Sequence, residues 1–217
     1  MGSDGTFRPP ARKLFVESED VRDEWADRSG EYSPEYYAYY GPDDTTETIL
    51  EAVQSHLGPD PAILEVGSSS GRHLAALQEA GYDDLTGVEV NEDAREVMTE
   101  QFPALAETGT FHYDSIESVI EGFETDQFDA VFAVETLQHL HPDSEWVFAE
   151  LARVTGRLLI TVENEGEEPV EDPPAINYVD GDVPLYYRDW KRIFTDLGLD
   201  AVAEESGPRD TIRIFRA

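Results

Sequence analysis

From about residue 46 onward, short apolar runs alternate with amphipathic stretches along the chain. The apolar runs have the length of buried strands and cover 62–66, 85–90, 110–113, 128–134 and 158–162. The stretches between them have helical spacing and cover 72–80, 91–102, 115–120 and 142–155. Pro103 and Gly156 are the expected stops of the second and last of these helices. Strands that alternate with helices predict an α/β fold, a doubly wound and mostly parallel sheet with right-handed crossovers.

The pattern changes at both ends of this alternating region. Ser33-Pro34 predicts a helix start in an aromatic-rich arm over 1–45, and a further helix is expected over 46–57. The segment 164–186 breaks the rhythm as a long acidic loop, and such loops in compact domains are usually functional or mobile. A helix over 187–197 and strands over 201–205 and 211–215 then complete a seven-stranded sheet. We therefore expect an arm followed by one domain over 46–217, and the arm either closes over a ligand or packs against the sheet edge.

The chain is strongly acidic, with 48 Asp and Glu residues against 15 Lys and Arg and a formal net charge of −33. Such a charge suits either a basic partner or a surface adapted to a salt-rich cytosol, where salt screens the self-repulsion. The acids are spread along the whole chain, which favours the surface of a halophilic protein. Tight nucleic-acid binding normally needs a basic patch, so this charge disfavours it.

Composition excludes several other classes. The chain has no cysteine, which excludes disulfides, thiolate metal sites and cysteine nucleophiles. No apolar run approaches the length of a membrane span. The first residues lack the apolar segment of a secretory signal, so a cytoplasmic location is expected.

The most informative chemistry lies in 62–74, AILEVGSSSGRHL. A buried strand leads into a loop bounded by Gly67 and Gly71 and then into a helix, which is how α/β proteins build a nucleotide site. Glycines let the backbone turn sharply and approach a ligand. Glu65, two residues before the first glycine, adds a carboxylate that suits a positively charged ligand group.

Further acids follow the next strands. Glu89 ends the second strand, eighteen positions past Gly71 (89 − 71), where an acid accepts hydrogen bonds from ribose hydroxyls. Asp114, with Ser115 beside it, follows the third strand and either faces an adenine amino group or caps the next helix. Because parallel strands end at one edge of the sheet, Glu65, Glu89, Asp114 and Glu135 are expected to cluster there.

The segments EVGSSSG, GVEVN, HYDS and FDAVFAVETLQHL, taken in order, resemble the class I S-adenosylmethionine-dependent methyltransferases. The resemblance covers about residues 46–163, and the last strands fit the family's terminal β-hairpin. The chain departs from the family's Gly-x-Gly-x-Gly pattern at Ser69, which stands at the middle glycine. The resemblance implies that S-adenosylmethionine is the cofactor. The residues it implies as cofactor-binding are Glu65, Gly67, Ser68, Ser69, Gly71, Glu89, Val90, Asp114, Ser115 and Glu135.

The expected reaction is an in-line methyl transfer to a small-molecule acceptor. The protein mainly positions the acceptor and, for a hydroxyl, removes its proton. Candidates follow the fourth strand in ETLQHLH, and His139 is the candidate base or substrate contact, with packing as its alternative role. We expect no metal site. The expected pocket walls are the arm aromatics and, from the later part of the chain, Tyr178, Tyr186, Tyr187 and Arg188.

Three other functions compete with this interpretation. A short-chain dehydrogenase would use VGSSSGRH with Tyr187 and Lys191, but His73 replaces its third glycine and Glu65 has no role beside a pyrophosphate. A nucleic-acid methylase would use the sequence DPP at 172–174, but this follows the fifth strand instead of the fourth. A non-catalytic protein that has a methyltransferase-like fold and only binds a partner is the third alternative. The oligomeric state and the atom that accepts the methyl group do not follow from the sequence.

Overall fold

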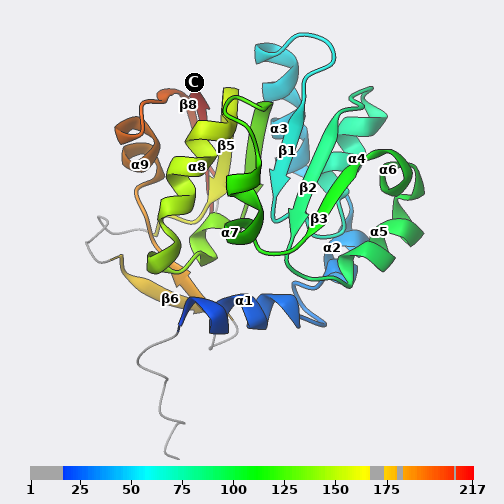
Figure 1. Cartoon of the computed structure of the whole chain (residues 1–217), viewed down its shortest axis with the longest axis horizontal. Coiled ribbons are helices and arrows are strands. Elements are labelled where there is room, and N and C mark those ends of the chain that lie inside the picture. The colour runs from blue at the N-terminus through cyan, green and yellow to red at the C-terminus, as the bar shows by residue number, and fades with distance from the viewer. Residues whose placement is uncertain (1–16, 167–173, 180–182, 208) are drawn as a thin grey trace, which may run out of the picture.

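The computed structural model describes residues 17–166, 174–179, 183–207 and 209–217 (Figure 1). Its centre is a seven-stranded sheet in the order β3-β2-β1-β4-β5-β9-β8. β1 to β5 run parallel, and β9 and β8 add an antiparallel edge. The strands are β1 Ile63–Val66, β2 Leu85–Glu89, β3 Thr110–Tyr113, β4 Phe128–Val134, β5 Thr155–Glu163, β8 Asp200–Ser206 and β9 Thr211–Arg216. The predicted doubly wound, mostly parallel seven-stranded fold is confirmed.

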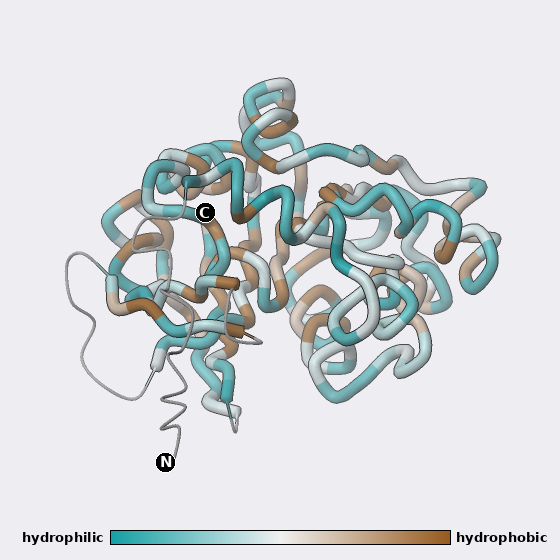
Figure 2. The backbone as a smooth tube through the Cα atoms, turned by 90° about the horizontal axis from the view of Figure 1, so that it is seen from below, coloured by the Kyte–Doolittle hydropathy of each residue, from teal (hydrophilic) through white to brown (hydrophobic). Residues whose placement is uncertain are grey.

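Helices cover both faces of this sheet. They are α3 Asp44–His56, α4 Arg72–Glu79, α5 Ala94–Gln101, α6 Pro103–Thr108, α7 Ile116–Val119, α8 Trp146–Val154 and α9 Trp190–Asp196, with 3₁₀ turns η1 Ile120–Gly122, η2 Leu137–His139 and η3 Pro142–Ser144. Successive strand residues point to opposite faces, so Leu64 packs with α7 to α9 while Ile63 packs with α3 to α6. The helices alternate between hydrophilic and hydrophobic residues, as helices with one buried face do (Figure 2). Among the described residues, no helix is long and apolar enough to cross a bilayer.

The order of the sheet reverses between β1 and β4. β2 and β3 lie on one side of β1, and β4 and β5 continue on the other. The connections from β1 and from β4 therefore leave in opposite directions, which opens a crevice at the carboxyl ends of these two strands. This crevice is the place where the fold positions a ligand.

The described part of the arm lies below this edge of the sheet. α1 Ser18–Ala26 and α2 Pro34–Tyr40 run across the carboxyl ends of the strands at the bottom of Figure 1. The Ser33 hydroxyl accepts a hydrogen bond from the Tyr36 amide at 3.3 Å, which confirms the predicted helix start. α1 was not predicted, because most of its residues are polar and Val21 is its buried residue.

The segment expected as a long loop contains a β-hairpin. β6 Ile176–Val179 pairs antiparallel with β7 Val183–Tyr186, while 167–173 and 180–182 lie outside the described residues. The predicted stop at Pro103 is confirmed, because α5 ends at Gln101, and Pro103 then opens α6 at its first position, where a missing amide costs nothing. Two other helix boundaries differ from the prediction. α8 ends before Gly156, since β5 already begins at Thr155, and α9 begins at Trp190 after the Asp189 cap.

The start of α3 is tied to the start of α4. The Asp43 carboxylate caps α3 by accepting the Thr46 amide at 3.0 Å, and it pairs with Arg72 at 2.8 Å. The Thr46 hydroxyl lies 2.7 Å from Nδ1 of the buried His73. Arg72 and His73 follow directly on the glycine-bounded loop, so these contacts fix the helix that begins there.

Replacing Asp43 with alanine should lower the free energy of unfolding by about 1–2 kcal/mol, since the change removes both a helix cap and an ion pair. Asp44→Ala is the matched control, because Asp44 is exposed and contributes only a first-turn charge, worth less than about 1 kcal/mol. Urea unfolding at constant high salt measures both variants. Equal losses for the two would contradict the assigned role of Asp43.

Candidate functional site

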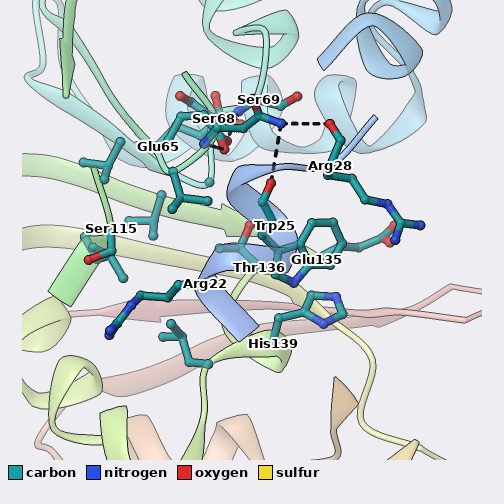
Figure 3. A pocket seen from close by; sticks show the side chains of 18 of the residues that line it. Arg22, Trp25, Arg28, Glu65, Ser68, Ser69, Ser115, Glu135, Thr136 and His139 are labelled. Atoms are coloured by element: carbon teal, nitrogen blue, oxygen red, sulfur yellow. Dashed lines mark hydrogen bonds between the residues drawn. The ribbon is translucent and has the colours of Figure 1, made fainter. Parts of the chain in front are cut away.

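A cleft that is partly open to solvent lies at the switch point between the strand ends and the arm (Figure 3). Its floor comes from the ends of β1, β2 and β4, and α1 and α2 supply its other side. The structure brings together almost all residues that the sequence analysis selected. Those that line the cleft are Glu65, Gly67, Ser68, Ser69, Glu89, Val90, Asp114, Ser115, Glu135 and His139.

Gly71 is the one expected cofactor-binding residue that does not line the cleft. It begins α4 with a φ of +83°, and a Cβ there would lie 2.8 Å from Leu105 Cδ2. A glycine is needed here because Leu105 of α6 packs too close to leave room for a side chain. The left-handed backbone conformation also favours glycine.

The loop after β1 is folded tightly against its neighbours. The amides of Gly67 and Ser68 both donate to the Val88 carbonyl, at 2.8 and 3.0 Å. A Cβ on Gly67, whose φ is +73°, would overlap the Thr136 side chain. Ser69 has a φ of +46°, so this serine adopts the left-handed conformation that the family's middle glycine allows, at a cost of about 1–2 kcal/mol.

Glu89 connects this loop to the end of β2. Its Oε2 accepts the Ser69 amide at 2.7 Å and its Oε1 accepts the Asn91 amide at 2.8 Å. Burial raises the pKa of Glu89 above its usual range, and these amides oppose the change. A carboxylate has about four acceptor positions, so Glu89 keeps acceptor capacity for ligand hydroxyls while it holds the loop.

Glu65 is a buried acid with an unsatisfied oxygen. Its side chain is 1% exposed, and Oε2 has no hydrogen-bond partner among the described residues. Burial raises the pKa of Glu65 well above its usual range; Arg72 opposes this and Glu89 adds to it. An unpaired buried acceptor is costly, and an ammonium group of a ligand would satisfy it. Glu65 is therefore suited to a cationic ligand group.

Asp114 and Ser115 follow β3. The Ser115 hydroxyl caps α7 by accepting the Ser118 amide at 3.3 Å. Asp114, which the sequence analysis left open as the cap, instead accepts the Ser115 amide at 2.7 Å and is exposed. The cap therefore belongs to Ser115, and Asp114 faces the cleft from its own strand end.

The loop after β4 is held by a glutamate that the sequence analysis missed. Glu163, fully buried at the end of β5, accepts the backbone amides of η2 and the residue before it: Thr136 at 3.2 Å, Leu137 at 3.0 Å and Gln138 at 3.1 Å. Burial raises the pKa of Glu163 to about 8. Its sequence signal was an acid at the end of an otherwise apolar strand.

In the same loop Glu135 has a φ of +49° and forms an ion pair with Arg209 of the β8–β9 turn.

His139 lies in this loop, buried beside the cleft. Its Nδ1 is 2.9 Å from the Pro184 carbonyl, so Nδ1 carries the proton and donates it. Its Nε2 then accepts from the Gln138 side-chain amide at 3.3 Å. The Trp25 ring centroid is 4.7 Å away (Figure 3). Burial lowers the pKa of His139 to about 4, so the ring is neutral near pH 7.

The arm is attached to the same strand ends. The buried side-chain amide of Asn91 donates to the carbonyls of Arg28 at 3.0 Å and Trp25 at 3.4 Å (Figure 3). Trp25, Tyr32 and Tyr37 line the cleft. The Arg28 guanidinium lies over the Trp25 and Tyr32 rings at 5.7 and 5.5 Å. The arm therefore closes one side of the cleft with aromatic and guanidinium groups.

The expected walls from the later part of the chain are not found. Tyr178, Tyr186, Tyr187 and Arg188 do not line the cleft. Arg188 is 2% exposed and supports the loop after β4 by donating to Glu145 at 3.0 Å and to the Leu140 carbonyl at 2.8 Å. Within the described ranges, no three His, Asp or Glu side chains are grouped so that they could hold a metal ion.

Comparison with known proteins agrees with this geometry. Residues 63–157 match the model of a family described as a methyltransferase domain. An O-methyltransferase of Pyrenophora dematioidea is 27% identical over 146 residues, which cover 62% of this chain and 54% of that protein. An O-methyltransferase of Penicillium expansum is 25% identical over 141 residues, or 61% and 51% of the two chains. The chain thus spans about half the length of the curated relatives it matches.

Solved structures share the fold. A Burkholderia thailandensis 1,6-didemethyltoxoflavin-N1-methyltransferase with bound S-adenosylhomocysteine superposes with a TM-score of 0.62 at 15% identity, covering 92% of this chain and 83% of that one. A magnesium protoporphyrin IX methyltransferase of Synechocystis with bound S-adenosylmethionine gives a TM-score of 0.62 at 14% identity, covering 95% and 98%. The chain therefore has the class I methyltransferase fold.

The raised pKa of Glu163 predicts how stability changes with pH. A glutamate in the unfolded chain titrates at about pH 4.3, whereas Glu163 in the folded protein titrates at about pH 8. Between these two pH values the folded state binds more protons than the unfolded state. The contribution of Glu163 to the free energy of unfolding is therefore largest at low pH and declines as the pH rises through that range. Glu163→Gln cannot ionise, so its free energy of unfolding should decline less over the same range. Glu121→Gln, at an exposed position, is the control; equal pH slopes for wild type and Glu163→Gln would contradict the prediction.

Proposed function

We propose that this protein transfers a methyl group from S-adenosylmethionine to a small-molecule acceptor. The observation that carries the proposal is the buried, unpartnered Oε2 of Glu65 beside Glu89 in the switch-point cleft. A cationic amino group and a ribose satisfy these two acids together, whereas a pyrophosphate would repel both. The methyltransferase-domain match over 63–157 and the two O-methyltransferase relatives support the same reaction.

The cofactor would lie along the strand ends. Glu65 and the backbone of Gly67, Ser68 and Ser69 would hold its amino-acid end. The remaining contacts would come from the ends of β2, β3 and β4, through Glu89 and Val90 to the ribose, Asp114 and Ser115 to the adenine, and Glu135 near the amino-acid end. When bound, the cofactor supplies an electrophilic methyl group on a sulfonium, which already has a good leaving group. The protein's own task is to position the acceptor and exclude water.

The acceptor would lie between the loop after β4 and the arm, where His139 and Trp25 meet. Oxygen is the acceptor atom that the relatives' names favour. His139 is proposed to line the acceptor site beside Trp25. The described arm residues are proposed to form a lid over the domain at 46–217, since Asn91 attaches them beside Glu89.

Calorimetric titration with S-adenosylmethionine, S-adenosylhomocysteine and NADH, at high salt, tests the proposal. Binding of the sulfonium and of its demethylated product, with no NADH binding, is the expected result. Binding of NADH alone would overturn the proposal in favour of a dehydrogenase. Binding of none of the three would favour a methyltransferase-like fold that only recruits a partner.

Glu89→Gln should weaken S-adenosylhomocysteine binding about 10- to 150-fold, because a charge-assisted hydrogen bond contributes about 1.5–3 kcal/mol. Glutamine keeps one acceptor oxygen for the loop amides, so the variant should remain folded. Glu92→Gln, an exposed neighbour, is the matched control and should bind like the wild type. Unchanged affinity in Glu89→Gln would reject the ribose role.

We also propose that the acidic surface is an adaptation to a salt-rich cytosol, which supports a cytoplasmic location in a halophile. With a formal net charge of −33, self-repulsion should destabilise the fold when salt is removed. The melting temperature should therefore rise steadily as potassium chloride is increased towards molar concentration. A melting temperature that does not respond to ionic strength would refute the adaptation.

A further inference from the structure

The acceptor side of the cleft contains several arginines although the chain as a whole is strongly acidic. Arg22 and Arg28, on either side of Trp25 in Figure 3, line the cleft from the arm. Arg28, Arg188 and Arg209 all act on His139 from different elements, and each lowers its pKa. These three arginines disfavour a protonated imidazole. Arg188 and Arg209 are themselves paired with Glu145 and Glu135, so the cations that an anionic ligand could reach on this side of the cleft are Arg22 and Arg28 of the arm.

The histidines that line the cleft are poorly placed to take a proton. The His139 lone pair, at Nε2, already accepts from Gln138. The Nδ1 lone pair of His141 already accepts the Asp143 amide at 3.2 Å. Burial lowers the pKa of His73 to about 3, and its Nδ1 is bound to Thr46.

The carboxylates of the cleft are also engaged. Glu135 pairs with Arg209, and Glu117 pairs with Arg22 at 3.5 Å and accepts the Ser144 hydroxyl at 2.9 Å. Glu65, Glu89 and Asp114 belong to the proposed cofactor end. A hydroxyl that must lose its proton during the reaction thus meets no well-placed base among the described lining residues.

Donors, in contrast, are available on the acceptor side. The Trp25 indole Nε1 is buried without a hydrogen-bond partner among the described residues. His141, which also lines the cleft, carries its ring hydrogen on Nε2 when Nδ1 accepts the Asp143 amide. An unpaired buried donor is costly, and a negatively charged oxygen is the ligand atom that would satisfy it best.

We infer that the acceptor of the proposed reaction enters as a preformed oxyanion, a carboxylate or an ionised acidic phenol, held by the arm arginines and the Trp25 indole. The inference rests on the proposed methyl transfer and defines its substrate class. An oxygen lone pair of the acceptor forms the new O–CH₃ bond while the carbon–sulfur bond breaks and its electron pair stays on sulfur. The products are a neutral ester or ether and the thioether, and no proton moves. His139 is then a positioning residue that keeps the loop against β7.

The test uses 4-nitrophenol, whose anion has its own visible absorption, bound to the protein saturated with S-adenosylhomocysteine. The pH titration of the bound probe should show an apparent pKa at least one unit below that of the free probe, so that the anion binds about tenfold or more tightly than the neutral phenol. Arg28→Gln should reduce this shift. Arg192→Gln, which removes an exposed charge on α9 outside the cleft, should leave the shift unchanged.

Trp25→Phe is a second variant that keeps an aromatic ring and removes the donor, so it should also reduce the shift. An unshifted or raised probe pKa would overturn the inference, as would equal shifts in Arg28→Gln and Arg192→Gln. Failure of the probe to bind a protein that does bind S-adenosylhomocysteine would overturn it too, and would leave the proposed methyl transfer standing. Failure to bind S-adenosylhomocysteine would defeat the proposed function itself.

Discussion

Two glutamates at strand ends, the half-buried Glu89 and the fully buried Glu163, hold the loops that form the facing walls of the cleft. Glu89, at the end of β2, binds the amides of Ser69 and Asn91. Glu163, at the end of β5, binds three consecutive amides of the loop after β4. Burying an acid is costly, and hydrogen bonds from fixed backbone amides offset that cost. The cleft has its shape because these two carboxyl groups organise backbone amides that would otherwise lack partners.

The glutamate at β2 also links the cofactor end of the cleft to the arm. The Asn91 amide that donates to Glu89 belongs to the residue whose side chain holds the carbonyls of Trp25 and Arg28. Trp25 in turn packs on His139 across the cleft. A change at the proposed ribose site is therefore connected through one residue to the groups that face the acceptor.

The sheet and the floor of the cleft could be predicted from the sequence, because they follow from local patterns. The apolar runs place strands, and each run ends where a polar residue such as Glu65 or Glu89 must reach the same edge. The glycine-bounded loop has a backbone requirement that Gly67 meets directly. Ser69 broke the family pattern, yet the structure shows it in the left-handed conformation of the glycine it replaces.

The parts that could not be predicted depend on contacts between distant segments. α1 has few buried residues and so little periodicity. Arg188 was expected at a pocket wall because a cation in a polar segment suggests a ligand, but it binds Glu145, 43 residues away in sequence. The role of Glu163 depends on amides 25 to 27 residues earlier, which no local pattern reveals.

The most direct measurement is a crystal structure of the protein grown with S-adenosylhomocysteine. The ligand's amino group should lie within hydrogen-bond distance of Glu65 Oε2 and its ribose hydroxyls should bind Glu89, with the Ser69 amide still donating to the Glu89 side chain. A complex in which the ligand binds elsewhere, or in which Glu65 remains buried without a ligand contact, would contradict the proposed cofactor site.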